Sequence, residues 1–155
     1  MQIVQGTLTT VFSTTSESFT DTGLEVKITP STAAKSILVR VCGTIAVAGA
    51  TGAVHAQLLR DATPIAIGDA AGSRVQGSYG HNCLAAIGGE YHSNACGSGI
   101  TIYDSPATAS EVTYKLQIRR DTGGSCTAYL NACGTDADTA DWGRPCATII
   151  AWELD

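Results

Sequence analysis

The chain alternates apolar and polar residues over short segments, and this alternation constrains its fold more than any other feature. In VTYKLQIR (Val112–Arg119), every second residue is apolar, and the residues between them are Thr, Lys, Gln and Arg. Side chains of a β-strand point alternately to its two faces, so one face of this segment is predicted to pack on a core. The other face carries two cations, and we expect it to meet water or a polar subunit boundary. LEVKIT (Leu24–Thr29) repeats the pattern until Pro30 ends it.

Turn-forming residues separate such segments along the whole chain. Gly, Pro, Asn, Asp and Ser recur between them, and no segment keeps a convincing helical period. We therefore predict one all-β domain over residues 1–155, with about eight to ten strands in an antiparallel sandwich or jelly roll. The predicted strands are Gln2–Phe12, Leu24–Thr29, Ile37–Val47, Val54–Arg60, Pro64–Gly68, Cys83–Ile87, Ile100–Tyr103, Glu111–Arg119, Cys126–Asn131 and Cys146–Leu154.

Two of these strands are apolar on both faces. In CATIIAWELD (Cys146–Asp155), the residues that include Ile150 and Trp152 face one way, and the alternate Ala and Ile residues face the other. The segment Ser36–Val47 is similar. A sandwich strand usually keeps one face in water, so a second cover is needed here. We expect another subunit to supply it, with Ile150 and Trp152 as buried contacts in the core or at the subunit boundary. A loop formed by residues 69–99 is the alternative cover.

The charge pattern excludes several classes of partner. The formal net charge is −5, and the nine Lys and Arg residues are scattered instead of forming a basic stripe. Nucleic-acid binding and attraction to anionic membranes are therefore not expected. The most apolar stretch, Val41–Val54, is rich in Gly and Thr and shorter than the about 20 apolar residues of a membrane helix. The N-terminal segment lacks the basic and apolar regions of a signal peptide.

The cysteines fit no familiar redox or zinc motif. There are six of them, and none forms a Cys-x-x-Cys pair, so zinc ribbons and thioredoxin-like sites are not predicted. The pairs closest in sequence, Cys83 with Cys96 and Cys126 with Cys133, are the candidate disulfides. Buried reduced thiols are the equal alternative. Disulfides would fit a protein that works outside a cell.

Catalytic and metal-binding motifs do not stand out in the chain. His81 and His92 flank a stretch containing Cys83 and Glu90, but their spacing matches no standard ligand pattern. The carboxylates of GTDADTAD (Gly134–Asp141) lack the bidentate Glu of an EF-hand, so a solvated acidic turn is expected. No nucleophile elbow, phosphate-binding loop or zinc-protease motif occurs. We predict no enzyme activity, no cofactor and no metal.

A Gly-rich segment between Asp69 and Gly99 carries the residues best suited to surface recognition. Tyr79, His81, Tyr91 and His92 cluster there among glycines and asparagines. These residue types together make an adaptable contact surface. An ordered loop whose aromatic residues serve packing is the alternative.

Several stretches resemble a β-rich module of tailed-bacteriophage virion proteins. They are SFTDTGLEVKITPSTAAKSILVRVCGTI, LLRDATPIAIGDAAGSR, IYDSPATASEVTYKLQIRRDTG, and AYLN followed by WGRPCATIIAWEL, and they span most of Phe19–Leu154. The resemblance implies a jelly-roll-like β domain, commonly trimeric, that is displayed on the particle. Cys42, Cys146 and the richer loop between Gly80 and Gly99 depart from the pattern of the module.

The resemblance implies one of two functions, and both work by binding at the virion surface. The first is a capsid decoration, or cement, protein that contacts the major capsid protein and stabilises the head shell. Residues 1–12, as an N-terminal extension or first strand, would then reach a neighbour through Ile3, Val4 and Leu8. The second is a tail-fibre tip that contacts tail proteins and adsorbs to a host surface receptor through the Gly-rich segment.

Overall fold

The computed structural model describes residues 1–48, 52–83, 95–122, 125–132, 138, 140 and 143–155. Within these ranges, residues 81–83 and 95–98 are described by their backbone alone. This part of the chain contains strands and no helix. Its eleven strands are β1 (Ile3–Leu8), β2 (Phe12–Thr14), β3 (Thr20–Ile28), β4 (Ile37–Ala48), β5 (Gly52–Arg60), β6 (Thr63–Ile65), β7 (Tyr79–Cys83), β8 (Ala95–Asp104), β9 (Val112–Arg120), β10 (Thr127–Leu130) and β11 (Ala147–Glu153).

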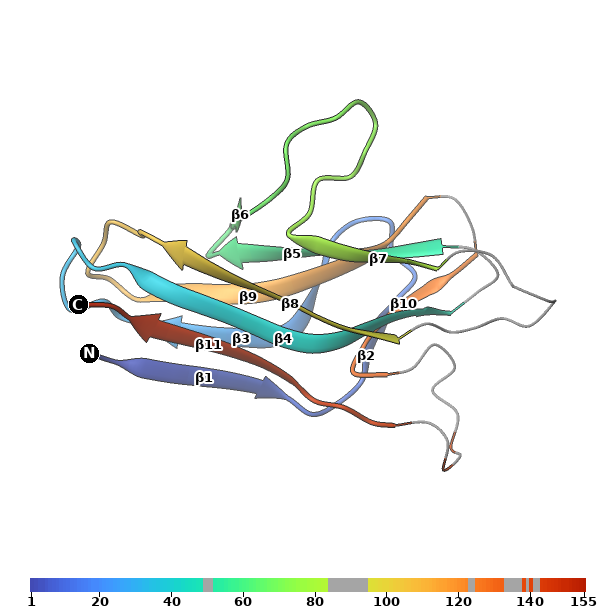
Figure 1. Ribbon diagram of the computed structural model, residues 1–155, viewed down its shortest axis with the longest axis horizontal. Helices are drawn as coiled ribbons and strands as arrows, with labels where there is room; N and C mark the ends of the chain where they lie inside the picture. The colour runs from blue at the N-terminus through green and yellow to red at the C-terminus, as the bar shows by residue number, and fades with distance from the viewer. Residues whose placement is uncertain (49–51, 84–94, 123–124, 133–137, 139, 141–142) are drawn as a thin grey trace.

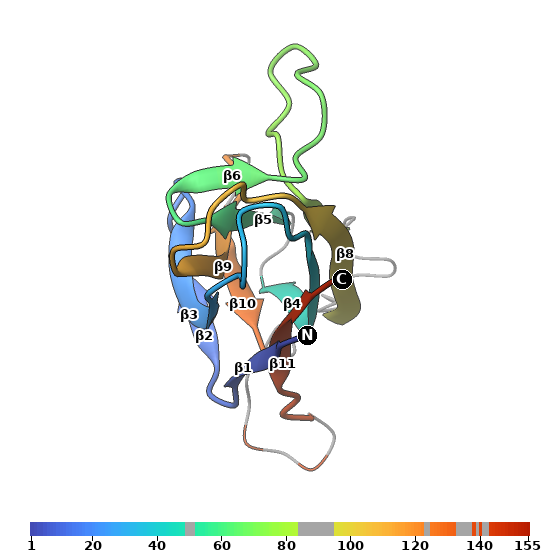
Figure 2. The ribbon, with the colours of Figure 1, turned by 90° about the vertical axis from the view of Figure 1, so that its left-hand side faces the viewer.

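The strands form two antiparallel sheets that pack as a β-sandwich (Figure 1). In the first sheet β4 is central, with β11 and then β10 along one edge and β8 along the other. Strands β1 and β2 flank β11 and β10. In the second sheet the order is β3-β9-β5, and β6 and β7 share the far edge of β5. Seen from one end, the sheets curve around a common core (Figure 2).

The core lies between the inner faces of the two sheets and follows the predicted alternation. Buried residues alternate with exposed ones in β3 and with half-buried ones along most of β9. The largest fully buried side chains include Tyr114 and Ile118 of β9 and Ile37 and Ile45 of β4. Burying one such aliphatic side chain stabilises the fold by about 1.5–3 kcal/mol. A register slip of one residue would expose a whole strand's core set, so the pattern fixes the pairing.

Strand β3 begins four residues earlier than the predicted Leu24, because it continues through a β-bulge and pairs with β9 on both sides of it. The pairing with β9 shifts between Asp21 and Glu25, and Gly23 within the bulge has φ of +83°. Glycine adopts this conformation without the steric cost that a side chain would add. The buried Thr22 hydroxyl donates to the Leu116 carbonyl at 2.8 Å, which joins the bulged segment to β9.

The N-terminal segment, predicted as one strand over Gln2–Phe12, is two strands that pair with different neighbours. β1 pairs with β11, and β2 pairs with β10. Between them the chain turns, and the Asn131 side-chain amide donates to the carbonyls of Leu8 at 2.7 Å and Thr10 at 3.2 Å. Asn131 itself has φ of +66°, which asparagine tolerates better than most residues. This long-range contact could not be read from the local sequence.

The remaining predicted strands differ from the structure in their bounds, and the strand predicted at Ile100–Tyr103 is the last part of the longer β8. Of the strand predicted at Cys83–Ile87 the structure describes only Cys83, which ends β7, so that strand stays a prediction. The strand predicted at Pro64–Gly68 is shortened to β6. Ala66 has φ of +52°, a left-handed conformation that takes the chain out of the sheet.

Replacing Gly6 by alanine should lower the free energy of unfolding by about 2 kcal/mol, because the added methyl group overpacks a close approach of the sheets. A Cβ at Gly6 in β1 would collide with the backbone carbonyl of Glu25 in β3, and backbone cannot move aside like a flexible side chain. Urea unfolding measures the change. Gly68→Ala is the matched control, since a Cβ there meets nothing within 4 Å. Equal stability of the two variants would contradict the close approach.

Candidate protein-contact surface

One row of large apolar side chains crosses the outer face of the first sheet. Ile3 of β1 pairs with Trp152 of β11, Trp152 pairs with Leu38 of β4, and Leu38 pairs with Tyr103 of β8. Directly paired residues project on the same side of a sheet, so the four side chains form one continuous line. We call Ile3, Leu38, Tyr103 and Trp152 the apolar row.

The apolar row is exposed in the single chain. Tyr103 is 76% exposed, Ile3 54% and Trp152 38%, while Leu38 is half-buried. Among the described residues five large apolar side chains are classed as exposed; three of them lie in the row, and Met1 precedes it in the sequence. Single exposed apolar residues are ordinary on protein surfaces, but a contiguous group marks a site of contact with another molecule.

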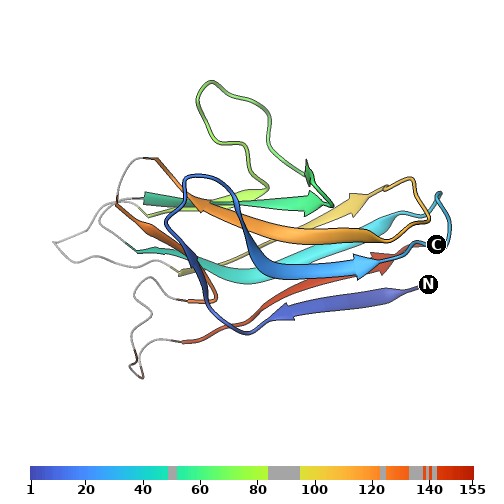
Figure 3. The same cartoon turned by 180° about the vertical axis from the view of Figure 1, so that it is seen from behind.

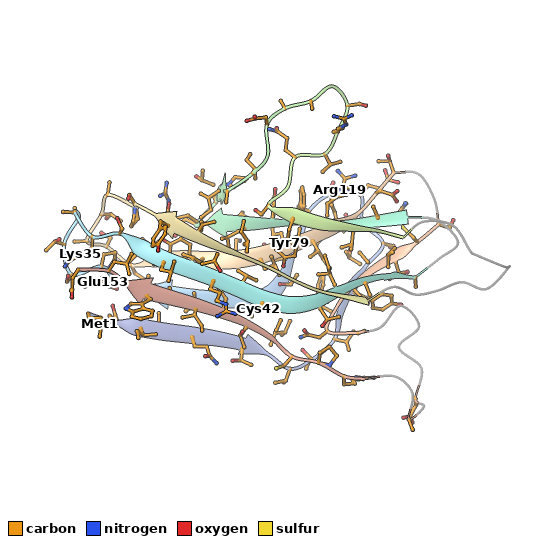
Figure 4. All side chains as sticks on the ribbon, in the orientation of Figure 1. Met1, Lys35, Cys42, Tyr79, Arg119 and Glu153 are labelled. Carbon is orange, nitrogen blue, oxygen red and sulfur yellow. The ribbon has the colours of Figure 1, made fainter. Side chains whose placement is uncertain are left out.

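A shallow hollow lies beside the apolar row on the same face. The next pairs along the strands join Gln5, Ile150, Arg40 and Thr101, and the following ones join Thr7, Thr148, Cys42 and Gly99. The hollow has a volume of about 450 Å³ and lies over β4 and β8, beside Gly99, which carries no side chain. Arg40 and Cys42 line it, and Cys42 is labelled on β4 in Figure 4.

Carboxylates near this end of the first sheet point inward, away from the outer face. Glu153 and Asp104 both pair with the core residue Ile37, which places their side chains on the inner side. Glu153 is 2% exposed and accepts hydrogen bonds from the Ser31 N–H at 2.6 Å and the Ser31 hydroxyl at 2.9 Å. These bonds, that of the backbone N–H first, lower the pKa of Glu153. The carboxylate thus stays ionised and holds the β3–β4 connection against β11.

The outer face of the second sheet differs in chemistry from that of the first. Asp21 accepts hydrogen bonds from Lys115 and Gln117, and Gln57 donates to Gln117 at 2.7 Å. The hydrogen bond from Lys115, followed by that from Gln117, lowers the pKa of Asp21. Polar groups on this face therefore satisfy one another across three strands. The polar face predicted for Val112–Arg119 is confirmed as part of this network.

The structure brings together some of the predicted contact residues and separates others. Ile3, Ile150 and Trp152 share the outer face of the first sheet. Val4 and Leu8 instead pack against the core cluster, because alternate residues of β1 face opposite sides. Val4 and Leu8 are half-buried, and their contact with a neighbouring chain stays a prediction. Leu38 and Tyr103 were missed, although each stands between inward-facing residues and so must face outward.

The predicted recognition residues do not form a described surface. Tyr79 lies in β7 and packs against the core, and its hydroxyl is buried with no hydrogen-bond partner among the described residues. Burial raises the pKa of Tyr79, so the hydroxyl stays protonated. Figure 4 labels Tyr79, the first residue of β7. The backbone of His81 belongs to β7, but its side chain, like Tyr91 and His92, lies outside the described part of the chain.

The candidate disulfides are only partly described. Cys126 is a buried free thiol that donates to Asp121 at 3.5 Å, and its predicted partner Cys133 lies outside the described residues. Cys83 and Cys96 stand in β7 and β8 at the two ends of residues 84–94, and their side chains are not described. The pairing of Cys83 with Cys96 stays a prediction.

The described residues contain neither a metal site nor a membrane-spanning helix. No group of three or more His, Cys, Asp or Glu side chains in that part of the chain could hold a metal ion. No helix there is long and apolar enough to cross a membrane. Comparison of the chain with models of known protein families and with curated proteins gave no match.

Proposed function

We propose that the chain is a structural protein of a tailed-bacteriophage virion, and that it decorates the capsid exterior as a homotrimer. The bacteriophage assignment and the trimer rest on the resemblance of the sequence. The strand orders β1-β11-β4-β8 and β3-β9-β5-β7 support a jelly-roll fold, an architecture found in viral capsid domains.

The observation that carries the proposal is the apolar row on the outer face of the first sheet. An exposed line of Ile, Leu, Tyr and Trp suits contact with protein, because aromatic anchors supply most of the binding energy of such interfaces. A decoration protein works through this kind of contact area, with a copy of itself and with the major capsid protein. Ile3, Ile150 and Trp152 are the predicted contacts that lie on this face.

The tail-fibre tip is the alternative, and it depends on different residues. Its predicted receptor-binding residues Tyr91 and His92 lie outside the described part of the chain, and the Tyr79 hydroxyl is buried. The described residues therefore offer it less support than they offer a contact protein.

The test is to locate the protein on virions with an antibody raised against it, by electron microscopy. We expect label over the head at many copies. Label confined to the tail end would overturn the decoration proposal and establish the fibre-tip alternative. Virions without label, together with a positive control antibody against the shell, would overturn the virion assignment altogether.

A further inference from the structure

An arm of the chain projects from the sandwich at the edge of the second sheet. Residues 66–78, which connect β6 to β7, extend away from both sheets, and Figures 1 and 3 show the arm from opposite sides. In Figure 2 the arm rises beyond β6, next to the side of the molecule where β8 forms the border of the first sheet. We call residues 66–78 the arm.

Hydrogen bonds within the arm, and those of Ser78 to β5 and β6 at its base, hold the arm in the absence of a core of its own. The Gly68 N–H donates to the Gly77 carbonyl at 3.2 Å, and the Gln76 amide donates to the Gly68 carbonyl at 2.7 Å. Ala66 and Gly72 have φ of +52° and +61°, which set the turns at its base and tip. Residues 66–74 are all exposed. A preorganised segment of this kind pays less ordering entropy when it docks on a partner.

The composition of the arm matches the hollow on the outer face of the first sheet. Its tip, Ala70–Ser73, carries only small side chains, which can enter a shallow depression. Asp69 and Ile67 precede the tip. Ile67 is 41% exposed and is the large apolar side chain of the arm that is available for contact. Arg40 lines the hollow beside the apolar row. Neither Asp69 nor Arg40 forms an ion pair with any residue that the structure describes.

Charge favours a second copy of this chain as the partner. Two chains of formal charge −5 repel each other, so they can associate only where carboxylates are not apposed. The paired residues of β1, β11, β4 and β8 on the outer face, from Ile3 to Gly99, include one formal charge, the Arg40 cation. An arm that brings Asp69 to this face adds an attraction where the rest of the surface would repel.

We propose that the arm of one copy docks in the hollow of the next, with Asp69 beside Arg40 and Ile67 against the apolar row. The contact is heterologous, because the arm and the hollow are different surfaces of the same chain. Arg74, on the far side of the tip, stays outside the hollow. The inference rests on the proposed function and names the partner of its contact surface.

Disulfide trapping tests the contact with a native thiol. Cys42 lines the hollow as a free, half-buried cysteine, so Ala70→Cys should place a second thiol near it in the assembled protein. With oxidised glutathione, we expect covalent dimers and higher species on a non-reducing gel. The same variant carrying Cys42→Ser should give none of them, which excludes the exposed Cys146 as the partner. Lys27→Cys, on the outer face of the second sheet, is the control for random collision.

Charge reversal provides an independent readout of the same contact. Arg40→Glu and Asp69→Arg should each raise the dissociation constant of the oligomer by about tenfold, and the double variant should return it to within about threefold of the original. Sedimentation velocity measures all three. An oligomer that neither forms the Ala70→Cys crosslink nor responds to charge reversal would overturn docking of the arm but leave the virion proposal intact. A chain that is monomeric at all concentrations would also overturn the docking of the arm. The antibody label on virions tests the proposed function separately.

Discussion

Replacing Asp104 by alanine should lower the free energy of unfolding by about 3 kcal/mol, because it leaves two partners in the second sheet without their acceptor. The Asp104 carboxylate in β8 accepts from the Arg60 guanidinium at 2.8 and 3.1 Å and from the Tyr114 hydroxyl at 2.6 Å. Arg60 belongs to β5 and Tyr114 to β9, so this cluster joins the two sheets at one end of the sandwich. Urea unfolding of the variant measures the loss.

The size of this effect follows from burial. Tyr114 is fully buried, and the Asp104 and Arg60 side chains are 11% and 28% exposed, so water replaces the lost bonds poorly. Burial, with a further contribution from the hydrogen bond to Asp104, raises the pKa of Tyr114 and keeps its hydroxyl a donor. Arg60 retains a weaker contact with the Ser105 carbonyl at 3.4 Å, which limits the loss.

Two variants separate the parts of the cluster. Tyr114→Phe removes one hydrogen bond and keeps the ring in the core, so it should cost about 1 kcal/mol. Asp104→Asn keeps the shape of the acceptor without its charge. Its loss in the free energy of unfolding should lie between those of Tyr114→Phe and Asp104→Ala. Surface substitutions usually change the free energy of unfolding by less than about 0.5 kcal/mol. If the free energy of unfolding of Asp104→Ala differs from that of the original protein by no more than this, the cluster does not stabilise the sandwich.

The strands were predictable because their signal is local. Alternation in β3 and β9 depends only on neighbours in the sequence, and it predicted which side chains are buried. The two-sided apolarity of β4 and β11 was equally local, and it identified the sheet that carries the apolar row. For the same reason Ile150 and Trp152 could be selected as candidate contact residues without a structure, although their contacts stay a prediction.

The parts that could not be predicted depend on pairing between distant segments. The apolar row exists because β1, β11, β4 and β8 align in one register, which joins residues as far apart in the sequence as Ile3 and Trp152. The turn held by Asn131 divides the N-terminal segment into β1 and β2, which pair with different strands. The Asp104–Tyr114 contact crosses a turn and joins two sheets. None of these has a signature in a single stretch of sequence.

The double variant Tyr103→Ser, Trp152→Ser should leave the chain folded and abolish the self-association that we propose. Both side chains are exposed in the single chain, so their loss should change the free energy of unfolding by less than about 1 kcal/mol for each residue. In an assembled interface, aromatic anchors of this kind are worth about 2 kcal/mol or more each. Two such losses correspond to a rise of about 1,000-fold in the dissociation constant.

Sedimentation velocity over a range of concentrations should therefore find the original chain assembled and the double variant monomeric, and far-ultraviolet circular dichroism should find both folded. Phe19→Ser is the matched control, because it removes an aromatic side chain that stacks on Arg119, 5.9 Å from the ring centre, away from the apolar row. This control should stay assembled. A double variant that assembles like the original would remove the apolar row from the interface, since no interface that buries Tyr103 and Trp152 could lose both rings without weakening.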